Sequence, residues 1–241
     1  MKNYNPTIGY ASLSDIDAEK ATNTATFGKK IVEKLYPEIE INSIFIAGCG
    51  DGTEAILVQR LFNKFVYGID ISLEKEIDEP NILILKKGDL MQLSLPPQSF
   101  DYIYSYHVLE HVPNPSTVLK SLADIIKDDG VIFIGFPNKN RLIGYIGTHN
   151  NVSVWDKIKW NLQDFKDRLL GRFENHLGAH AGFSNKEFMK LTSNIFAKVQ
   201  PVRNDYMLLK YSRYKLLIQL FIKLGLSEIL FPSNYYVIKI K

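Results

Sequence analysis

Residues 43–53 read SIFIAGCGDGT, and this stretch decides the fold class. An apolar run, expected to be a buried parallel strand, leads into a glycine-rich turn, and a helical pattern (TEAILVQRLF, residues 53–62) follows at once. Gly48, Gly50 and Gly52 can adopt backbone angles closed to other residues, and they let a ligand approach the main chain closely. Ordinary strand-to-helix turns carry similar glycines, but the combination is typical of α/β folds that bind a nucleotide-like cofactor.

Acidic side chains follow the next two predicted strands. The apolar residues 65–69 end in Asp70, which is placed to accept hydrogen bonds from both hydroxyls of a ribose. The alternative is a solvated acid that caps the next turn. The strand predicted over residues 81–86 leads to Asp89 and Leu90, which are expected to bind the exocyclic amine of an adenine and to form an apolar wall for its ring.

A fourth predicted strand, residues 100–105, leads into the sequence YHVLEHVPNP. The glycine turn, the two acids and this polar turn then lie at four successive strand ends, on the edge of a parallel sheet where ligands bind in open α/β folds. The residues expected to contact the cofactor all lie at these strand ends: Ala47, Gly48, Cys49, Gly50, Gly52, Asp70, Ile71, Asp89, Leu90, Tyr106 and His107.

These motifs resemble those of the class I S-adenosylmethionine-dependent methyltransferases, most closely the group that methylates small molecules. The resemblance is carried by IAGCGDGTEA, YGIDIS, KKGDL and SFDYIYSYHVLEHVPNPSTVL, and by the following strand in DDGVIFIGFPN. It implies S-adenosylmethionine as the cofactor and methyl transfer as the reaction. It also implies an α/β fold: a Rossmann-like sheet of seven mostly parallel strands, the last antiparallel, with helices on both faces and a helical cap.

The chain departs from the family pattern at two places. The family usually has an acid two residues before the first glycine of the loop, where this chain has Ile46, which removes one polar contact to the methionine end of the cofactor. In addition, only residues 73–79 separate the second and third predicted strands, so the helix usual at that point is short or absent.

The chain is expected to form a single domain over residues 1–241, with a cofactor-binding core over residues 26–138. Residues 1–24 are expected to be loosely structured, with Tyr4 and Tyr10 folding over the cofactor site. Further helices are predicted over 25–39, 115–127 and 184–195, and further strands over 131–136, 195–203 and 235–241. Gly130 is the expected helix terminator, and Ser184 with Glu187 the expected capping box.

Two segments lie outside this frame. Residues 139–183 form a long polar and aromatic insert, which is interpreted as a lid or substrate-binding element. Within the C-terminal part, residues 184–241, the stretch 206–231 is densely apolar with interspersed Lys and Arg. It fits a cap over the substrate, a homodimer interface or a basic amphipathic helix on a membrane, and we favour the cap or the dimer over peripheral membrane contact.

Methyl transfer from a sulfonium requires alignment of the two partners and removal of a proton from the acceptor. Neither a metal ion nor a covalent nucleophile is needed, and histidine is the natural base near neutral pH. Four histidines are therefore candidates for catalysis: His107, His111, His176 and His180.

The four candidates have different surroundings in the sequence. His107 directly follows the fourth strand and is expected to face the transferred methyl group. His111, together with Glu110, forms either a base with its orienting acid or a cap of the turn. His176 and His180 lie in a turn expected above the cofactor, where each is either the base or a hydrogen-bonded lid residue.

No metal site is predicted. In related quinone-pathway O-methyltransferases an acid stands at the position of His107, and that acid forms, with a glutamate and a histidine, a set that can hold a divalent ion. In this chain His107 replaces that acid, so the set of metal ligands is incomplete.

The composition of the chain bears on its cellular location and on its binding partners. The polar N-terminus, the lack of a membrane-spanning apolar stretch and the single cysteine, Cys49, favour the cytoplasm and argue against a disulfide framework. Residues 198–241 carry 8 Lys or Arg against 2 Asp or Glu, which is either a solvated face or a surface for an anionic partner.

A small molecule or a sugar is favoured as the acceptor, methylated on oxygen or else nitrogen. A nucleic-acid or protein methyltransferase is the weaker alternative, because no Asn-Pro-Pro-Tyr signature follows the fourth strand and no basic–aromatic binding module is present. A non-catalytic regulatory or assembly subunit is the other alternative.

Overall fold

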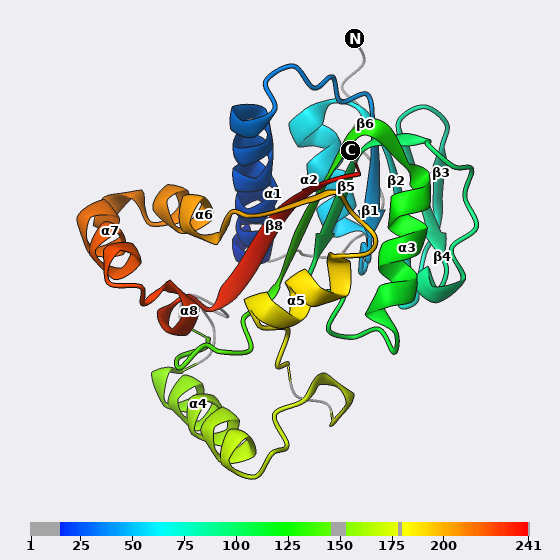
Figure 1. Ribbon diagram of the computed structural model, residues 1–241. Helices are drawn as coiled ribbons and strands as arrows, with labels where there is room; N and C mark the ends of the chain where they lie inside the picture. Colours follow the sequence, from blue (N-terminus) through cyan, green and yellow to red (C-terminus); the bar gives the residue numbers. More distant parts are fainter. Residues whose placement is uncertain (1–14, 146–152, 178–179, 241) are drawn as a thin grey trace.

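The computed structural model describes residues 15–145, 153–177 and 180–240. Its centre is one eight-stranded sheet with the order β3-β4-β2-β1-β5-β6-β8-β7 (Figure 1). The strands have the following bounds: β1 Ser43–Ala47, β2 Phe65–Asp70, β3 Ile77–Glu79, β4 Leu83–Lys87, β5 Phe100–Tyr106, β6 Ile126–Pro137, β7 Lys198–Pro201 and β8 Ser233–Lys239.

The five central strands β4, β2, β1, β5 and β6 run parallel, so their carboxyl ends meet at one edge of the sheet. β8 pairs antiparallel with both β6 and β7, as expected for a last antiparallel strand. The predicted α/β fold class is therefore confirmed. The sheet has one strand more than expected, because the short segment after β2 turns back as β3 and pairs antiparallel with β4 instead of forming a helix.

The helices have the following bounds: α1 Asp15–Leu35, α2 Thr53–Phe62, α3 Pro115–Ile125, α4 Val154–Leu169, α5 Asn185–Thr192, α6 Arg203–Lys210, α7 Lys215–Lys223 and α8 Ser227–Leu230. Three short 3-10 helices are η1 Leu90–Gln92, η2 Asn175–Leu177 and η3 Ser212–Tyr214. No helix among the described residues has both the length and the apolar content needed to cross a bilayer.

A hydrophobic core lies on each face of the sheet. On one face α1, α2 and α6 bury Val32, Val58 and Tyr206 against the strands. On the other face α3 and α5 bury Leu122 and Phe188. Figure 1 shows α3 and α5 together on one side of the sheet, away from α1 and α2. The amphipathic pattern of α3 thus packs as its sequence predicts.

Two sequence predictions about helix ends were wrong. α1 begins at Asp15, so residues 15–24 are helical rather than loosely structured, because a polar segment without helix breakers extends an existing helix at little cost. Gly130 does not terminate a helix: α3 ends at Ile125, the next residue is already extended, and Gly130 lies inside β6. The predicted contact of Tyr4 and Tyr10 with the cofactor site lies outside the described residues.

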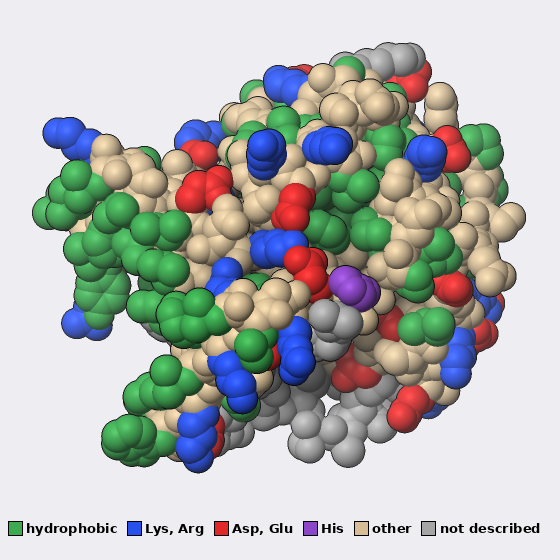
Figure 2. Space-filling model, turned by 60° about the horizontal axis from the view of Figure 1, so that its bottom comes forward, with side chains coloured by type: hydrophobic (Ala, Val, Ile, Leu, Met, Phe, Trp, Pro, Cys, Tyr) green, Lys and Arg blue, Asp and Glu red, His purple; other side chains and the backbone are tan. Residues whose placement is uncertain are grey.

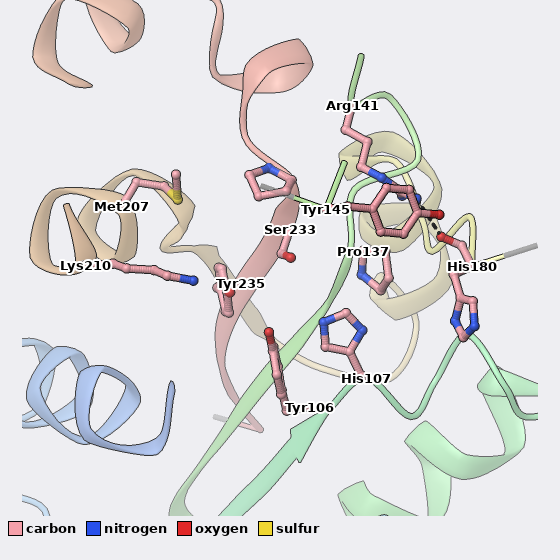
Figure 3. A pocket seen from close by; sticks show the side chains of 11 residues that line it. Tyr106, His107, Pro137, Arg141, Tyr145, His180, Met207, Lys210, Ser233 and Tyr235 are labelled. Carbon is pink, nitrogen blue, oxygen red and sulfur yellow. Dashed lines mark hydrogen bonds between the residues drawn. The ribbon is translucent and has the colours of Figure 1, made fainter. Parts of the chain in front are cut away.

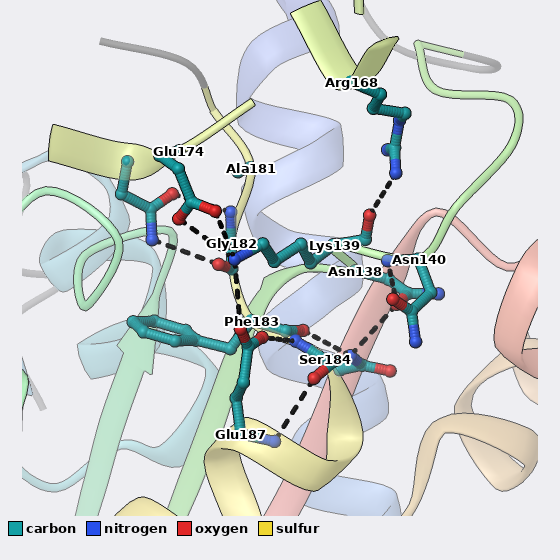
Figure 4. Close-up of polar contacts among 12 residues, drawn as sticks. Asn138, Lys139, Asn140, Arg168, Glu174, Ala181, Gly182, Phe183, Ser184 and Glu187 are labelled. Atoms are coloured by element: carbon teal, nitrogen blue, oxygen red, sulfur yellow. Dashed lines mark hydrogen bonds and ion pairs between the residues drawn. The ribbon is translucent and has the colours of Figure 1, made fainter. Parts of the chain in front are cut away.

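The capping box of α5 is confirmed. The Ser184 hydroxyl accepts a hydrogen bond from the Glu187 backbone N–H, and the Glu187 carboxylate accepts one from the Ser184 backbone N–H. Glu187 also pairs with Lys139, at 3.0 Å, and Lys139 in turn pairs with Glu174 at 2.9 Å (Figure 4). These ion pairs connect the first residue of the insert both to Glu174, later in the insert, and to the start of α5.

The segment 206–231 is folded into several short helices rather than one long helix. α6 packs on the sheet and buries Tyr206 and Met207, whereas α7 buries only Ile218. The two halves of this segment therefore serve different purposes: α6 belongs to the core, and α7 presents most of its apolar side chains outward.

Candidate active site

The glycine loop that follows β1 is held by Asp70 at the end of β2. One carboxylate oxygen of Asp70 accepts a hydrogen bond from the Gly50 backbone N–H at 2.7 Å, and the other accepts from the Ser72 backbone N–H at 2.8 Å. Gly48 has φ +80, and a Cβ at this residue would come within 2.2 Å of Val108. The loop thus has a fixed shape that only glycine can adopt at this point.

The four predicted strand ends meet at a single cavity of about 370 Å³. Gly48, Asp70, Asp89 and His107, which follow β1, β2, β4 and β5, all contribute to its wall. The cavity therefore lies where the sequence analysis expected the adenosyl part of a cofactor, and we call it the adenosyl cavity.

Apolar side chains are available for an adenine ring in this cavity. Ile71 lines it with 67% of its surface exposed, and Leu90 forms a buried part of the wall. Asp89 caps η1 by accepting a hydrogen bond from the Met91 backbone N–H at 2.8 Å, which leaves its second carboxylate oxygen for a ligand. An exposed isoleucine beside a free carboxylate oxygen fits an adenine with its exocyclic amine.

A second cavity, of about 410 Å³, lies on the other side of the glycine loop and is lined by Cys49, Gly50, Glu54 and Tyr106 among others. Cys49 is buried, and burial together with the nearby Asp70 raises the pKa of its thiol to about 12. The thiol is therefore neutral at physiological pH and is a packing residue at this site, in agreement with its small size.

Glu54 is a residue that the sequence analysis missed. It lies in the first turn of α2, lines the second cavity and accepts a 2.6 Å hydrogen bond from the Tyr104 hydroxyl. Burial raises the pKa of its carboxyl to about 7, although the hydrogen bond from Tyr104 acts in the opposite direction. Ile46, at the position where the sequence pattern usually has an acid, is fully buried, whereas Glu54 brings a carboxyl group to the wall of the second cavity. An acid in the first turn after the glycines was the signal available in the sequence.

His107 occupies an unusual backbone position. Its φ is +57, a left-handed conformation, and its backbone N–H donates to the Gly135 carbonyl at 2.9 Å. Its ring Nδ1 lies 3.0 Å from Oε1 of Glu110, whose side chain is completely buried and whose second oxygen has no partner among the described residues. The ring is thus held by a buried carboxylate, at a strained position typical of functional sites.

Glu110 therefore pairs with His107 rather than with His111, whose Nε2 is 3.9 Å away from the same oxygen. His111 lines the adenosyl cavity and packs edge-on against His180, with ring centroids 4.9 Å apart. Partial burial and the neighbouring His111 lower the pKa of His180. His176 lines a separate cavity beyond Glu110, which contains neither the glycine loop nor Tyr106.

A third cavity, of about 340 Å³, lies beyond His107 (Figure 3). Figure 3 shows Met207 and Lys210 entering it from α6, and Arg141, Tyr145 and His180 from the opposite side. The Arg141 guanidinium is buried and paired with Asp164 at 3.1 Å. The space therefore combines aromatic walls with cationic groups, which suits a polar acceptor molecule. In the described residues, no group of three or more His, Cys, Asp or Glu side chains could hold a metal ion.

The methyltransferase domain family matches residues 46–134. Among curated proteins, a ubiquinone biosynthesis O-methyltransferase of Neisseria meningitidis is 32% identical over 116 residues, which make up 44% of this chain and 48% of that protein. The 27-O-demethylrifamycin SV methyltransferase of Amycolatopsis mediterranei is 29% identical over 98 residues, or 36% of each chain. The chain spans about half the length, or less, of these relatives.

Solved structures extend the likeness over nearly the whole chain. A plantazolicin methyltransferase in complex with SAH and a desmethyl substrate analogue has a TM-score of 0.60 at 16% identity, covering 95% of this chain and 88% of that one. A Haemonchus contortus phosphoethanolamine N-methyltransferase in complex with S-adenosyl-L-methionine has a TM-score of 0.53 at 15% identity, covering 96% and 59%.

Residues 46–134 therefore carry a methyltransferase domain, and the sheet order with its converging strand ends is the fold of the solved methyltransferase structures. The cofactor of this domain is S-adenosylmethionine, which is the ligand held in a solved structure of the same fold.

Proposed function

We propose that the chain transfers a methyl group from S-adenosylmethionine to an oxygen of a small molecule, with His107 as the general base. Relatives that match the chain over the cofactor-binding core include proteins whose names specify methylation of oxygen, which supports an oxygen acceptor. The acceptor would occupy the cavity in front of Arg141 and Tyr235.

One observation carries this proposal: His107 lines all three cavities, those for the adenosyl part, the methionine part and the acceptor. The other three candidate histidines do not. His180 lines only the acceptor cavity, His111 lines the adenosyl cavity, and His176 lies beyond Glu110. A base must reach the proton of the attacking atom at the moment of transfer, so the residue at the junction of the three cavities is the best placed.

The residues of the chain divide the work as follows. The cofactor supplies an electrophilic methyl group on a sulfonium. Asp70 and Asp89 hold the adenosyl part, and Glu54 faces the methionine part. Glu110 accepts the hydrogen bond of Nδ1–H, which leaves the lone pair of Nε2 on His107 free to take the proton of the acceptor hydroxyl.

As the oxygen–methyl bond forms and the sulfur–methyl bond breaks, that proton moves to Nε2. The imidazolium produced in this step is then stabilised by the buried carboxylate of Glu110. The arrangement follows the general scheme of a base held by an acid.

Two observations bear on the alternatives. A non-catalytic subunit would have no need for the complete set of Gly48, Asp70 and Asp89 around an open cavity. Isothermal titration with S-adenosylhomocysteine tests this directly, since the absence of binding heat would leave only the scaffold function. A nucleic-acid acceptor would need a groove much longer than the acceptor cavity of about 340 Å³.

Asp70→Ala is expected to weaken binding of S-adenosylhomocysteine by about 1–3 kcal/mol, the range for removing one partner of buried hydrogen-bonding groups. The substitution removes the acceptor for a ribose and also frees the Gly50 N–H that shapes the loop. Titration calorimetry measures the change, and Asp124→Ala on the far end of α3 is a matched control. Unchanged affinity would show that the ribose binds elsewhere.

The acceptor itself is best identified by a screen of phenols, sugars and amphiphilic hydroxyl compounds with radiolabelled cofactor. The proposal expects label on oxygen in at least one class. Label found only on nitrogen, with His107 dispensable, would contradict the oxygen assignment and the role of the base together.

A further inference from the structure

α4 is an amphipathic helix whose apolar side chains are exposed to solvent rather than packed against the core. Its apolar side chains repeat at helical spacing and lie on one stripe: Val154, Ile158, Leu162, Phe165 and Leu169. All of these are exposed, with Leu162 at 63% and Leu169 at 74%, and no residue of α4 is buried. An amphipathic helix on a globular protein normally turns such a stripe toward the core.

A row of polar side chains beside the apolar stripe contacts the rest of the protein. Asn161 accepts a hydrogen bond from the Gly144 N–H at 2.6 Å, and Asp164 pairs with the buried Arg141 at 3.1 Å. One turn later, Arg168 donates to the Lys139 carbonyl at 2.6 Å (Figure 4). Since three successive turns are fixed in this orientation, the outward direction of the apolar stripe is built into the fold.

α7 presents a second set of exposed apolar side chains. Leu216 is 83% exposed, and Leu217, Leu220 and Leu224 are also exposed. Figure 2 shows the two sets as hydrophobic regions on the same side of the molecule, with Lys and Arg side chains among and beside them. We call these exposed side chains of α4 and α7, together with Trp155, the α4–α7 surface. Monomeric proteins rarely expose an apolar area of this extent without a partner.

The charges around this surface have one predominant sign. Lys215 and Lys223 begin and end α7, which contains no acid. On α4 and just after it, the bases are Lys157, Lys159, Lys166, Arg168 and Arg172, against Asp156, Asp164 and Asp167. Asp164 and Arg168 are both turned toward the protein, to Arg141 and to the Lys139 carbonyl, which leaves four bases and two acids. An apolar surface with a basic rim is complementary to a bilayer that contains anionic lipid.

A second copy of the chain is a poorer partner for the same surface. In a symmetric dimer the surface would meet itself, and the basic rims would lie against each other. Trp155, 73% exposed at the first turn of α4, is a residue type enriched at the boundary between lipid headgroups and acyl chains.

From these observations we propose that the α4–α7 surface docks the protein peripherally on anionic lipid, with the apolar side chains of both helices inserted between the headgroups. The same surface borders the acceptor cavity. An apolar groove of about 200 Å³ lies between α6, α7 and Ile143, and it shares Met207 and Pro232 with the wall of that cavity. Docking does not depend on methyl transfer, so each can fail without the other.

Vesicle sedimentation tests the proposal. The full chain is mixed with vesicles of phosphatidylcholine alone and with vesicles of phosphatidylcholine and phosphatidylglycerol. We expect binding to the mixed vesicles, weakened by salt, and much weaker binding to phosphatidylcholine. The double variant Leu162→Gln/Phe165→Gln is expected to lower the partition coefficient at least about tenfold, because two apolar side chains lose their burial in lipid.

Charge-reversal variants measure the electrostatic contribution to vesicle binding. Lys166→Glu/Lys223→Glu is expected to weaken binding to the mixed vesicles by about fivefold or more for each reversed charge. Lys120→Glu, an exposed lysine of α3 away from this surface, is the matched control and is expected to change binding little. Each variant is first checked for an unchanged melting temperature and for binding of S-adenosylhomocysteine, which shows that the fold and the cofactor site are intact.

Three results would overturn the proposal. One is the absence of binding to either kind of vesicle. Another is equal binding of the wild type and the Leu162→Gln/Phe165→Gln variant. The third is a concentration-dependent dimer in sedimentation equilibrium that this variant abolishes, which would identify a second copy as the occupant. Vesicle binding without any methyl transfer would leave the docking in place and contradict only the proposed function.

Discussion

His107→Asn is expected to lower kcat by about 10²- to 10⁴-fold, the usual contribution of a general base. Asparagine tolerates the left-handed backbone of this residue, so the turn after β5 should keep its shape. The amide cannot take up a proton, whereas the hydrogen bond to Glu110 can still form. Single-turnover methyl transfer at saturating cofactor measures the loss.

Variants of the other candidate histidines serve as comparisons for the loss of kcat in His107→Asn. His176→Asn is expected to leave kcat nearly unchanged, because the ring lines a cavity that does not reach the glycine loop. A large loss in His180→Asn with activity retained in His107→Asn would place the base on the other wall of the acceptor cavity and contradict the assignment. Titration with S-adenosylhomocysteine in each variant separates loss of chemistry from loss of binding.

Glu54→Gln is expected to have opposite effects on cofactor binding and on stability. Binding of S-adenosylhomocysteine should weaken about tenfold or more, because the carboxylate proposed to pair with the methionine ammonium is lost. Binding of 5′-methylthioadenosine, which lacks the amino-acid part, should be unchanged and serves as the internal control. Equal weakening of both ligands would show that the substitution disturbs the loop rather than an ion pair.

The stability effect follows from the pKa of Glu54. In the folded protein burial raises this pKa from 4.5 to about 7, so folding disfavours the charged carboxylate. The stability that depends on this group is complete below pH 4.5 and is lost as the pH rises to about 7. Glu54→Gln should therefore raise the free energy of unfolding of the cofactor-free protein at pH 8 by up to about 3 kcal/mol, and hardly at all below pH 4.5.

The same titration gives cofactor binding a pH dependence. As the pH falls below about 7, Glu54 takes up a proton in the free protein, and the affinity for S-adenosylhomocysteine is expected to fall with it. The affinity for 5′-methylthioadenosine should not follow this trend. Calorimetry at several pH values measures both ligands, and a wild-type curve with the same slope as that of Glu54→Gln would contradict the ion pair.

The cofactor-binding core could be predicted from the sequence because its signals are local. Gly48 follows a buried strand directly, Asp70 ends the next one, and parallel strands bring their carboxyl ends to the same edge without further information. The segment after β2 was correctly read as too short for a helix, but its pairing as β3 depends on the free edge of β4, which no local pattern reveals.

The orientation of α4 could not be predicted for a different reason. Periodicity shows that Ile158, Leu162 and Phe165 share one face of a helix, but it does not show whether that face points inward or outward. The answer lies in long-range partners, since Arg141 and Gly144 bind polar side chains that lie beside the apolar stripe. The same holds for Glu110, whose choice of His107 over His111 depends on the left-handed turn between β5 and α3.

The hydrogen bonds between Asp70 and the glycine loop affect how the enzyme turns over. The Asp70 carboxylate accepts hydrogen bonds from the Gly50 and Ser72 N–H groups in the ligand-free protein, so the loop loses little conformational entropy when the cofactor binds. The loop therefore does not need to close over the bound cofactor. The demethylated product then binds to the same preformed loop as the methyl donor. We expect competitive product inhibition to be strong, so that the rate in the cell follows the ratio of donor to product rather than the donor concentration alone.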